Sequence, residues 1–197
     1  MTRVLDWTDR GTCVLFGDGA GACLLGEVES NFGLLAQEVG SDGRGAEHLL
    51  IPAGAGAEPV SEKALPNKDF KLQMNGTEVF RFAVSVMGEA ALKALKKASI
   101  QTEEIDLFIP HQANKRIIEA ARKRLNLPQD RVFINLHKYG NTSCASIPLA
   151  LSEALDEGRI QEGNKIVIVG FGGGLAWGAL VFCWGGVPKN NAKATPS

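Results

Sequence analysis

Hydrophobic and polar positions follow two different spacings along the second half of the chain. Apolar runs of strand length occupy residues 105–109, 132–135, 166–169 and 175–184. Between them, helical spacing recurs over residues 77–97, 113–125 and 142–156. Strands that alternate with helices predict an α/β fold with a mainly parallel, covered sheet. Helix 77–97, with Thr77 as its N-cap, is apolar on more than one face, so we expect it to be buried between layers.

The first part of the chain has a different pattern. Gly11–Phe16 and Ala22–Val28 are apolar and flank the glycine-rich stretch 17–21, which predicts a hairpin-like pair of strands. Residues 31–66 are rich in Gly, Ala, Glu and Ser, and we expect an irregular excursion with one short strand at most. The last residues contain two prolines and no apolar pattern, which is typical of a loose tail.

Two glycine-rich turns, at residues 17–21 and 170–174, each lie between apolar runs. This internal repeat suggests a duplicated fold in which a pair of strands closes each half. This interpretation gives a division into four segments. Residues 1–30 would end a first half whose beginning is absent, 31–76 would connect, 77–185 would form the second half, and 186–197 would be the tail.

Composition narrows the classes of function. A hydrophobic share of 45% and a formal net charge of -1 over 197 residues are ordinary for a globular domain and give no nucleic-acid signature. We expect no membrane span and no signal peptide, because no apolar run approaches about 20 residues and the start has no apolar h-region. The four cysteines have no metal-ligand spacing, which indicates reduced thiols in the cytosol and no metal site.

Polar side chains follow two of the predicted strands. His111 comes directly after Phe108-Ile109-Pro110, and Asn141 lies in the turn that leads into helix 142–156. In open α/β sheets, the groups that do chemistry lie beyond the carboxyl ends of strands. Two side chains that donate hydrogen bonds there would form an oxyanion-stabilising pair. A helix-capping role for either residue is the alternative.

A third strand end carries Phe171-Gly172-Gly173-Gly174. Glycines in a turn expose backbone N–H groups, which suits an oxyanion hole or the close approach of a substrate. A simple tight turn is the alternative. The run is not a GxGxxG sequence that leads into a helix, so it does not predict a dinucleotide site.

Basic residues gather on one predicted helix, at Lys115, Arg116, Arg122, Lys123 and Arg124. They form either an ordinary solvated face or a surface that attracts an acidic or phosphorylated partner. Arg10, before the first apolar run, could meet a phosphate or stack on a base.

Taken with residues 9–12, 16–21 and 74–76, the three strand ends closely resemble β-ketoacyl-acyl-carrier-protein synthase III over about residues 4 to 185. The resemblance implies a thiolase-like fold, five-layered α/β/α/β/α in the whole enzyme. This chain would supply the C-terminal βαβαβ-type half and the closing strand pair of the N-terminal half. The family condenses acetyl-CoA with malonyl-acyl-carrier protein to start fatty-acid synthesis. The resemblance also implies that the whole enzyme is a homodimer in the cytoplasm, or in the plastid of a photosynthetic eukaryote. Its substrates would be CoA thioesters, and it would need no further cofactor.

The resemblance also implies roles for individual residues. His111 and Asn141 match two members of a Cys-His-Asn triad, Gly173 matches the oxyanion-hole glycine, and Phe171 matches the aromatic residue near it. Arg10 matches the arginine that packs on the CoA adenine. Asn75 and Asn114 match residues that line the pantetheine channel. The surface that docks the carrier protein corresponds to Lys115, Arg116 and Lys123.

One departure from the family pattern concerns the nucleophile. The family's cysteine lies in its N-terminal half and has no counterpart here, and Cys144 is not expected to replace it. The chain is then either the C-terminal portion of a synthase or a catalytically silent remnant. Two alternatives remain, a non-enzymatic subunit that binds CoA or the carrier protein, and a fragment of a polyketide-type synthase.

Overall fold

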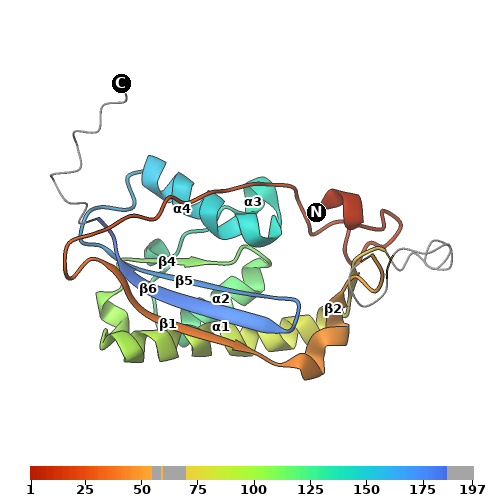
Figure 1. Cartoon of the computed structure of the whole chain (residues 1–197), viewed down its shortest axis with the longest axis horizontal. Coiled ribbons are helices and arrows are strands. Elements are labelled where there is room, and N and C mark those ends of the chain that lie inside the picture. Colours follow the sequence, from red (N-terminus) through yellow and green to blue (C-terminus); the bar gives the residue numbers. More distant parts are fainter. Residues whose placement is uncertain (55–58, 60–69, 186–197) are drawn as a thin grey trace.

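A four-stranded mixed sheet forms the centre of the molecule (Figure 1). The computed structural model describes residues 1–54, 59 and 70–185, so the predicted tail at 186–197 lies outside the described residues. The strand order is β1-β6-β5-β4, with bounds Gly33–Ser41, Ala176–Cys183, Lys165–Gly172 and Leu107–Pro110. β4 and β5 are parallel, whereas β6 is antiparallel to both β5 and β1. The predicted mainly parallel sheet is therefore wrong, because the turn after Gly172 reverses the chain directly into β6.

Helices lie on both sides of this sheet (Figure 1). On one side are α1 (Gly76–Ala98) and α2 (Lys115–Arg124), and on the other are α3 (Leu136–Tyr139) and α4 (Ser146–Asp156). The strands β2 (Leu49–Leu50) and β3 (Gln73–Met74) pair separately. Five 3-10 turns complete the described part of the chain: Thr2–Val4, Gly43–His48, Thr102–Glu104, Gln129–Arg131 and Ser143–Ala145.

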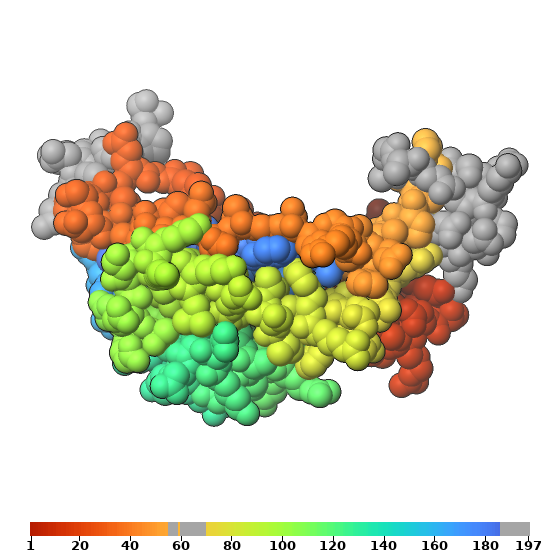
Figure 2. All heavy atoms as spheres, turned by 90° about the horizontal axis from the view of Figure 1, so that it is seen from below, coloured from red at the N-terminus to blue at the C-terminus, as the bar shows by residue number. Residues whose placement is uncertain are grey.

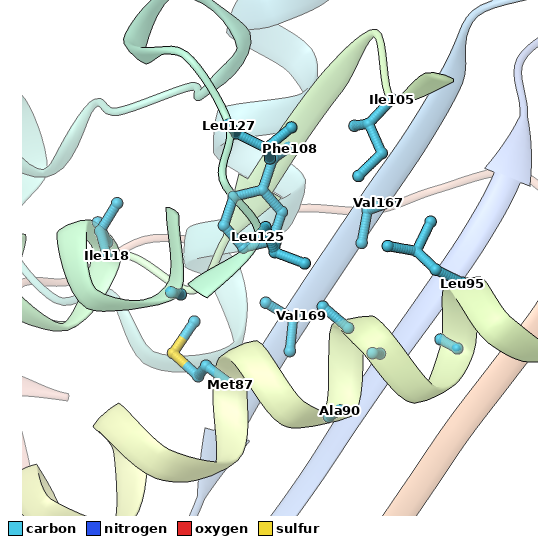
Figure 3. Close-up of a cluster of buried hydrophobic side chains, with 14 of the residues drawn as sticks. Met87, Ala90, Leu95, Ile105, Phe108, Ile118, Leu125, Leu127, Val167 and Val169 are labelled. Carbon is cyan, nitrogen blue, oxygen red and sulfur yellow. The ribbon is translucent and has the colours of Figure 1, made fainter. Parts of the chain in front are cut away.

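Alternation along the strands divides the core between the two sides of the sheet. Phe108 in β4 and Val167 and Val169 in β5 pack with Met87, Ala90 and Leu95 of α1 (Figure 3). Their neighbours in the strands point to the other side, where Leu107 and Ile166 pack with Ala150 and Ala154 of α4. Successive side chains of a strand point to opposite faces, so each strand contributes to both clusters.

Helix α1 lies between β1 and α2 (Figure 2). Its polar residues, among them Arg81, Glu89 and Lys93, are exposed. Its second apolar face, predicted from the sequence, therefore packs on a neighbouring helix of the same layer. Gly88 marks the close approach, since a Cβ there would lie 2.6 Å from Cγ of Arg124. The N-cap is Asn75, whose side-chain oxygen accepts from N–H of Glu78, so the predicted Thr77 cap is wrong by two positions.

The predicted hairpin at residues 11–28 does not form. Within residues 1–30, the structure has the turn Thr2–Val4 and one parallel bridge between Phe16 and Asn141. The segment instead runs along the α3–α4 side of the molecule (Figure 1), where a Cβ at Gly21 would clash with Pro148. Leu24 and Leu25 face the solvent at 100% and 91% exposure. A two-stranded hairpin with no further layer to pack against is marginally stable at best in water.

Three further predictions about elements are corrected. The irregular excursion contains β1, a nine-residue strand that pairs along β6. The predicted strand 132–135 reduces to a single parallel bridge between Val132 and Phe108. The helix predicted over 142–156 begins as an α-helix only at Ser146, because Ser143 has a positive φ of 56°. Strand and helix lengths depend on tertiary pairing, which local patterns do not contain.

An apolar hollow of about 450 Å³ lies on the sheet next to α4. Val39, Ile168 and Leu180 line it, one from each of β1, β5 and β6. Val39 is 66% exposed, so this part of the sheet face has little cover within the described residues.

Among the residues that the structure describes, every helix is too short or too polar to cross a bilayer.

Candidate active site

A cavity of about 340 Å³ opens where β4 and β5 end. Side chains from both ends of the chain line it. They include Leu15 and Phe16, Leu49, Leu50 and Met74 of the β2–β3 region, Val79 and Phe80 of α1, and His111, Asn114, Ile117, Asn141, Phe171 and Gly173. The cavity therefore brings together the three strand-end motifs that the sequence pointed to, and its walls are mainly apolar.

His111 directly follows β4 and is held from several directions. Its backbone N–H donates to the carbonyl of Val169 at 2.8 Å, which continues the parallel pairing with β5. Nδ1 lies 2.5 Å from Oγ of Ser146, and the ring meets Phe171 edge to face at 5.4 Å between centroids. Burial lowers the pKa of His111 to about 4, because a charged imidazolium would be poorly solvated there. At neutral pH, the imidazole is therefore uncharged.

Asn141 is placed by the N-terminal segment. Its N–H donates to the carbonyl of Leu15, and its carbonyl accepts from N–H of Gly17, both at 2.9 Å. Its side-chain oxygen accepts from N–H of Ser143 at 2.9 Å, which identifies this atom as the oxygen and the other as the NH₂ group. The NH₂ group is consequently the part of the side chain that can donate a hydrogen bond to a ligand.

Gln112 ties the His111 strand end to the segment that leads to Asn141. Its side-chain NH₂ donates to the carbonyls of Pro110 at 2.7 Å and Phe133 at 3.3 Å, and its oxygen accepts from N–H of Asn135 and Leu136. All four hydrogen-bonding positions of this buried carboxamide are filled. No local pattern in the sequence marks Gln112 or Ser146, because their contacts join residues far apart in the chain.

The other predicted site residues fall into two groups. Asn114 lines the cavity while its side chain caps α2 by accepting from N–H of Arg116 at 2.8 Å. Asn75 and Arg10 are exposed and next to the cavity, each one residue before a lining glycine, Gly76 and Gly11. Neither side chain belongs to the described lining.

The predicted basic surface is on α2, and its charged residues are not among the described residues that line the cavity. Lys115, Arg116 and Lys123 are exposed, and the guanidinium of Arg116 lies 5.0 Å from the ring centre of Phe80. Phe80 is also part of the cavity wall. A partner that contacts Arg116 would therefore stand at the cavity rim.

Cys144 is exposed and is not among the described residues that line the cavity. That Cys144 does not serve as the nucleophile stays a prediction. Within the residues that the structure describes, no three His, Cys, Asp or Glu side chains come together in a way that could hold a metal ion. The cavity contains a neutral histidine, a carboxamide and turn amides, all of which can donate hydrogen bonds.

Two family models match the sequence that forms this site. A family model described as 3-oxoacyl-[acyl-carrier-protein (ACP)] synthase III C terminal matches residues 95–184, and the model 3-oxoacyl-[acyl-carrier-protein (ACP)] synthase III matches residues 1–43. Together the two models cover more than half of the chain. Both models describe the family that the sequence motifs resemble.

Relatives cover most of the chain. A beta-ketoacyl-[acyl-carrier-protein] synthase III of Desulfitobacterium hafniense is 51% identical over 93% of this chain. A protein with the same name from Natranaerobius thermophilus is 50% identical. Among solved structures, the Thermus thermophilus synthase III superposes with a TM-score of 0.84 at 49% identity, covering 94% of this chain and 56% of that one. This chain also spans only 56% of the Desulfitobacterium relative.

Proposed function

Because the chain belongs to the 3-oxoacyl-[acyl-carrier-protein] synthase III family, with its thiolase-like fold, we propose that it carries the enolate-stabilising part of a condensing site. The whole enzyme would join acetyl-CoA to malonyl-acyl-carrier protein at the start of fatty-acid synthesis. One observation carries the proposal: a neutral His111 and the NH₂ group of Asn141 belong to the same cavity.

In the proposed step, the bond between the malonyl carboxylate and its neighbouring carbon breaks and carbon dioxide leaves. The electron pair moves into the thioester, which becomes an enolate with negative charge on its oxygen. His111 and Asn141 would each donate a hydrogen bond to that oxygen. Donors fixed in place before the charge develops stabilise it without reorganisation. The enolate carbon then attacks the acyl carbonyl and expels the thiolate that held the acyl group.

The acyl-bearing thiol would come from outside this chain. Covalent catalysis needs a thiolate held against the histidine and asparagine, and Cys144 is outside the cavity lining. The N-terminal half of the synthase is its proposed source, and Gly173 would provide an oxyanion-hole N–H. Arg10, Asn75, Asn114 and Phe171 would contact the CoA or pantetheine groups. The cytoplasmic location, the homodimer and the absence of a cofactor remain predictions from the resemblance.

The test supplies the missing half. This chain is mixed with the N-terminal portion of the Desulfitobacterium relative, and release of carbon dioxide and formation of 3-oxobutanoyl-carrier protein are measured. His111→Ala and Asn141→Ala should each slow decarboxylation by roughly 10²–10³-fold while acetyl transfer is affected less. Collapse of acetyl transfer with intact decarboxylation would show that the assigned roles are reversed.

A second measurement needs only this chain. Incubation with acetyl-CoA followed by mass spectrometry should give no stoichiometric acetyl adduct, because Cys144 is exposed and is not among the described residues that line the cavity. A full adduct on Cys144, absent from Cys144→Ser, would overturn the proposal that the nucleophile comes from elsewhere.

A further inference from the structure

Ser146 lies within hydrogen-bonding distance of the imidazole of His111. It is the first residue of α4 and is 2% exposed. Its Oγ is 2.5 Å from Nδ1 of His111 and 3.3 Å from the backbone nitrogen of Gln112. The hydroxyl therefore joins the start of α4 to the end of β4 through the residue assigned to the chemistry.

The hydrogen-bonding capacity of a hydroxyl determines its direction here. A serine hydroxyl has one hydrogen to donate and two lone pairs that accept. The N–H of Gln112 uses one lone pair. Within the part of the chain that the structure describes, the other partner of Oγ is Nδ1 of His111. If Nδ1 carried a hydrogen, the hydroxyl hydrogen would be buried without an acceptor, at a cost of about 1–3 kcal/mol.

We propose that Ser146 is a positioning residue, whose hydroxyl donates to Nδ1 of His111 and keeps the neutral imidazole in the tautomer that carries its hydrogen on Nε2. Nδ1 then acts as acceptor, and Nε2–H is the ring group left to donate. The edge-to-face contact with Phe171 restrains the same ring. The tautomer assignment stands on these contacts alone, and its consequence for decarboxylation rests on the proposed function.

The tautomer is measured directly on this chain, labelled with ¹⁵N-histidine, by long-range proton–nitrogen NMR at pH 7. The chain has three histidines, so His48→Gln and His137→Gln identify the remaining His111 signals. We expect an unprotonated, hydrogen-bonded Nδ1 and a protonated Nε2 for His111. A protonated Nδ1 in the unaltered chain would overturn the proposal without any variant.

Three variants separate the hydroxyl from the packing. In Ser146→Ala, the Nδ1 signal should move to the shift of a nitrogen without a hydrogen bond, and Ser146→Thr should restore the original shift. Ser152→Ala, an exposed position of the same helix, should leave it unchanged. An unchanged Nδ1 signal in Ser146→Ala would refute the contact.

The reconstituted enzyme tests the consequence separately. Ser146→Ala should slow decarboxylation about tenfold, the equivalent of one hydrogen bond, and Ser146→Thr should recover most of the rate. An unaltered rate in Ser146→Ala would exclude a positioning effect on catalysis. Absence of condensation in the unaltered enzyme would reject the proposed function and leave the NMR result standing.

Discussion

Phe16 and Asn141 pair through their backbones as one rung of a parallel ladder. The pairing holds the loop of Asn141 with two hydrogen bonds of 2.9 Å, to the carbonyl of Leu15 and from N–H of Gly17. One of the two side chains proposed to act on the enolate therefore depends on a segment from the other end of the chain.

The first prediction concerns Gly17. A Cβ at this position would lie 2.2 Å from the carbonyl oxygen of Tyr139, so Gly17→Ala forces the segment and the loop apart. Overpacking of this kind costs about 1–3 kcal/mol of unfolding free energy, measurable by urea denaturation. Gly26→Ala is the control, since a Cβ there meets nothing within 4 Å. Equal stability of the two variants would show that the segment is not docked on the loop.

The second prediction concerns the buried carboxamide of Gln112. In Gln112→Glu, a carboxylate would replace the NH₂ group that donates to the carbonyls of Pro110 and Phe133. We expect a loss of at least about 3 kcal/mol, because two acceptors lose their donor and a charge is buried beside them. The exposed Gln73→Glu should change stability by less than about 0.5 kcal/mol. A small effect at Gln112 would mean that the network is open to water.

The third prediction concerns pH. The pKa of His111 is lowered by burial to about 4, below its ordinary value of 6.5. Between these values the unfolded chain binds more protons at this site than the folded chain. This contribution to stability is therefore complete above about pH 6.5 and falls by up to about 1.4 kcal/mol per pH unit down to about pH 4.

Denaturation between pH 7 and pH 4.5 checks this contribution by comparing the unaltered chain with His111→Gln. Below about pH 6.5, the stability of the unaltered chain should fall more steeply with decreasing pH than that of His111→Gln. If His111 titrates near pH 6.5 by NMR, the site is hydrated and the prediction fails.

The fourth prediction concerns the exposed basic residues of α2. Arg116→Ala should weaken binding of malonyl-acyl-carrier protein to this chain several-fold, because the proposed carrier surface is acidic and Arg116 lies at the cavity rim over Phe80. The difference should shrink as salt rises. Arg159→Ala, which removes an exposed charge three residues after the end of α4, should bind normally. Equal losses for acetyl-CoA and the carrier protein would place Arg116 in a shared channel instead.

The fifth prediction concerns solubility of this chain by itself. Leu24, Leu25 and Val39 are 100%, 91% and 66% exposed, and Val39 borders the apolar hollow on the sheet. Sedimentation should show self-association that rises with concentration and decreases when the three are changed to serine. Leu155→Ser, at a single position of α4 with 36% exposure, should have little effect. A cooperatively melting, monodisperse monomer would contradict the expectation that these surfaces need cover.

The sequence by itself determined the elements whose signals are local. The patterns of α1, α2, β4 and β5 predicted the structure to within a few residues, because helix and strand spacing of apolar residues reflects burial on one face or both. It also placed His111 directly after a strand, at the edge where the carboxyl ends of the parallel strands β4 and β5 open into one crevice. Asn141, predicted to follow a strand at 132–135, instead follows α3 and is placed by the N-terminal segment.

Tertiary structure alone decided the features that depend on distant partners. β1 is a strand because β6 pairs along it. Residues 11–28 do not form a hairpin, and their side chains at Val14, Leu24, Leu25 and Val28 remain exposed. The contact between Ser146 and His111 joins two elements whose approach no local pattern contains. The spacing of apolar residues indicates which face of a helix or strand is buried. A hydrogen bond between two elements depends instead on how those elements pack against one another.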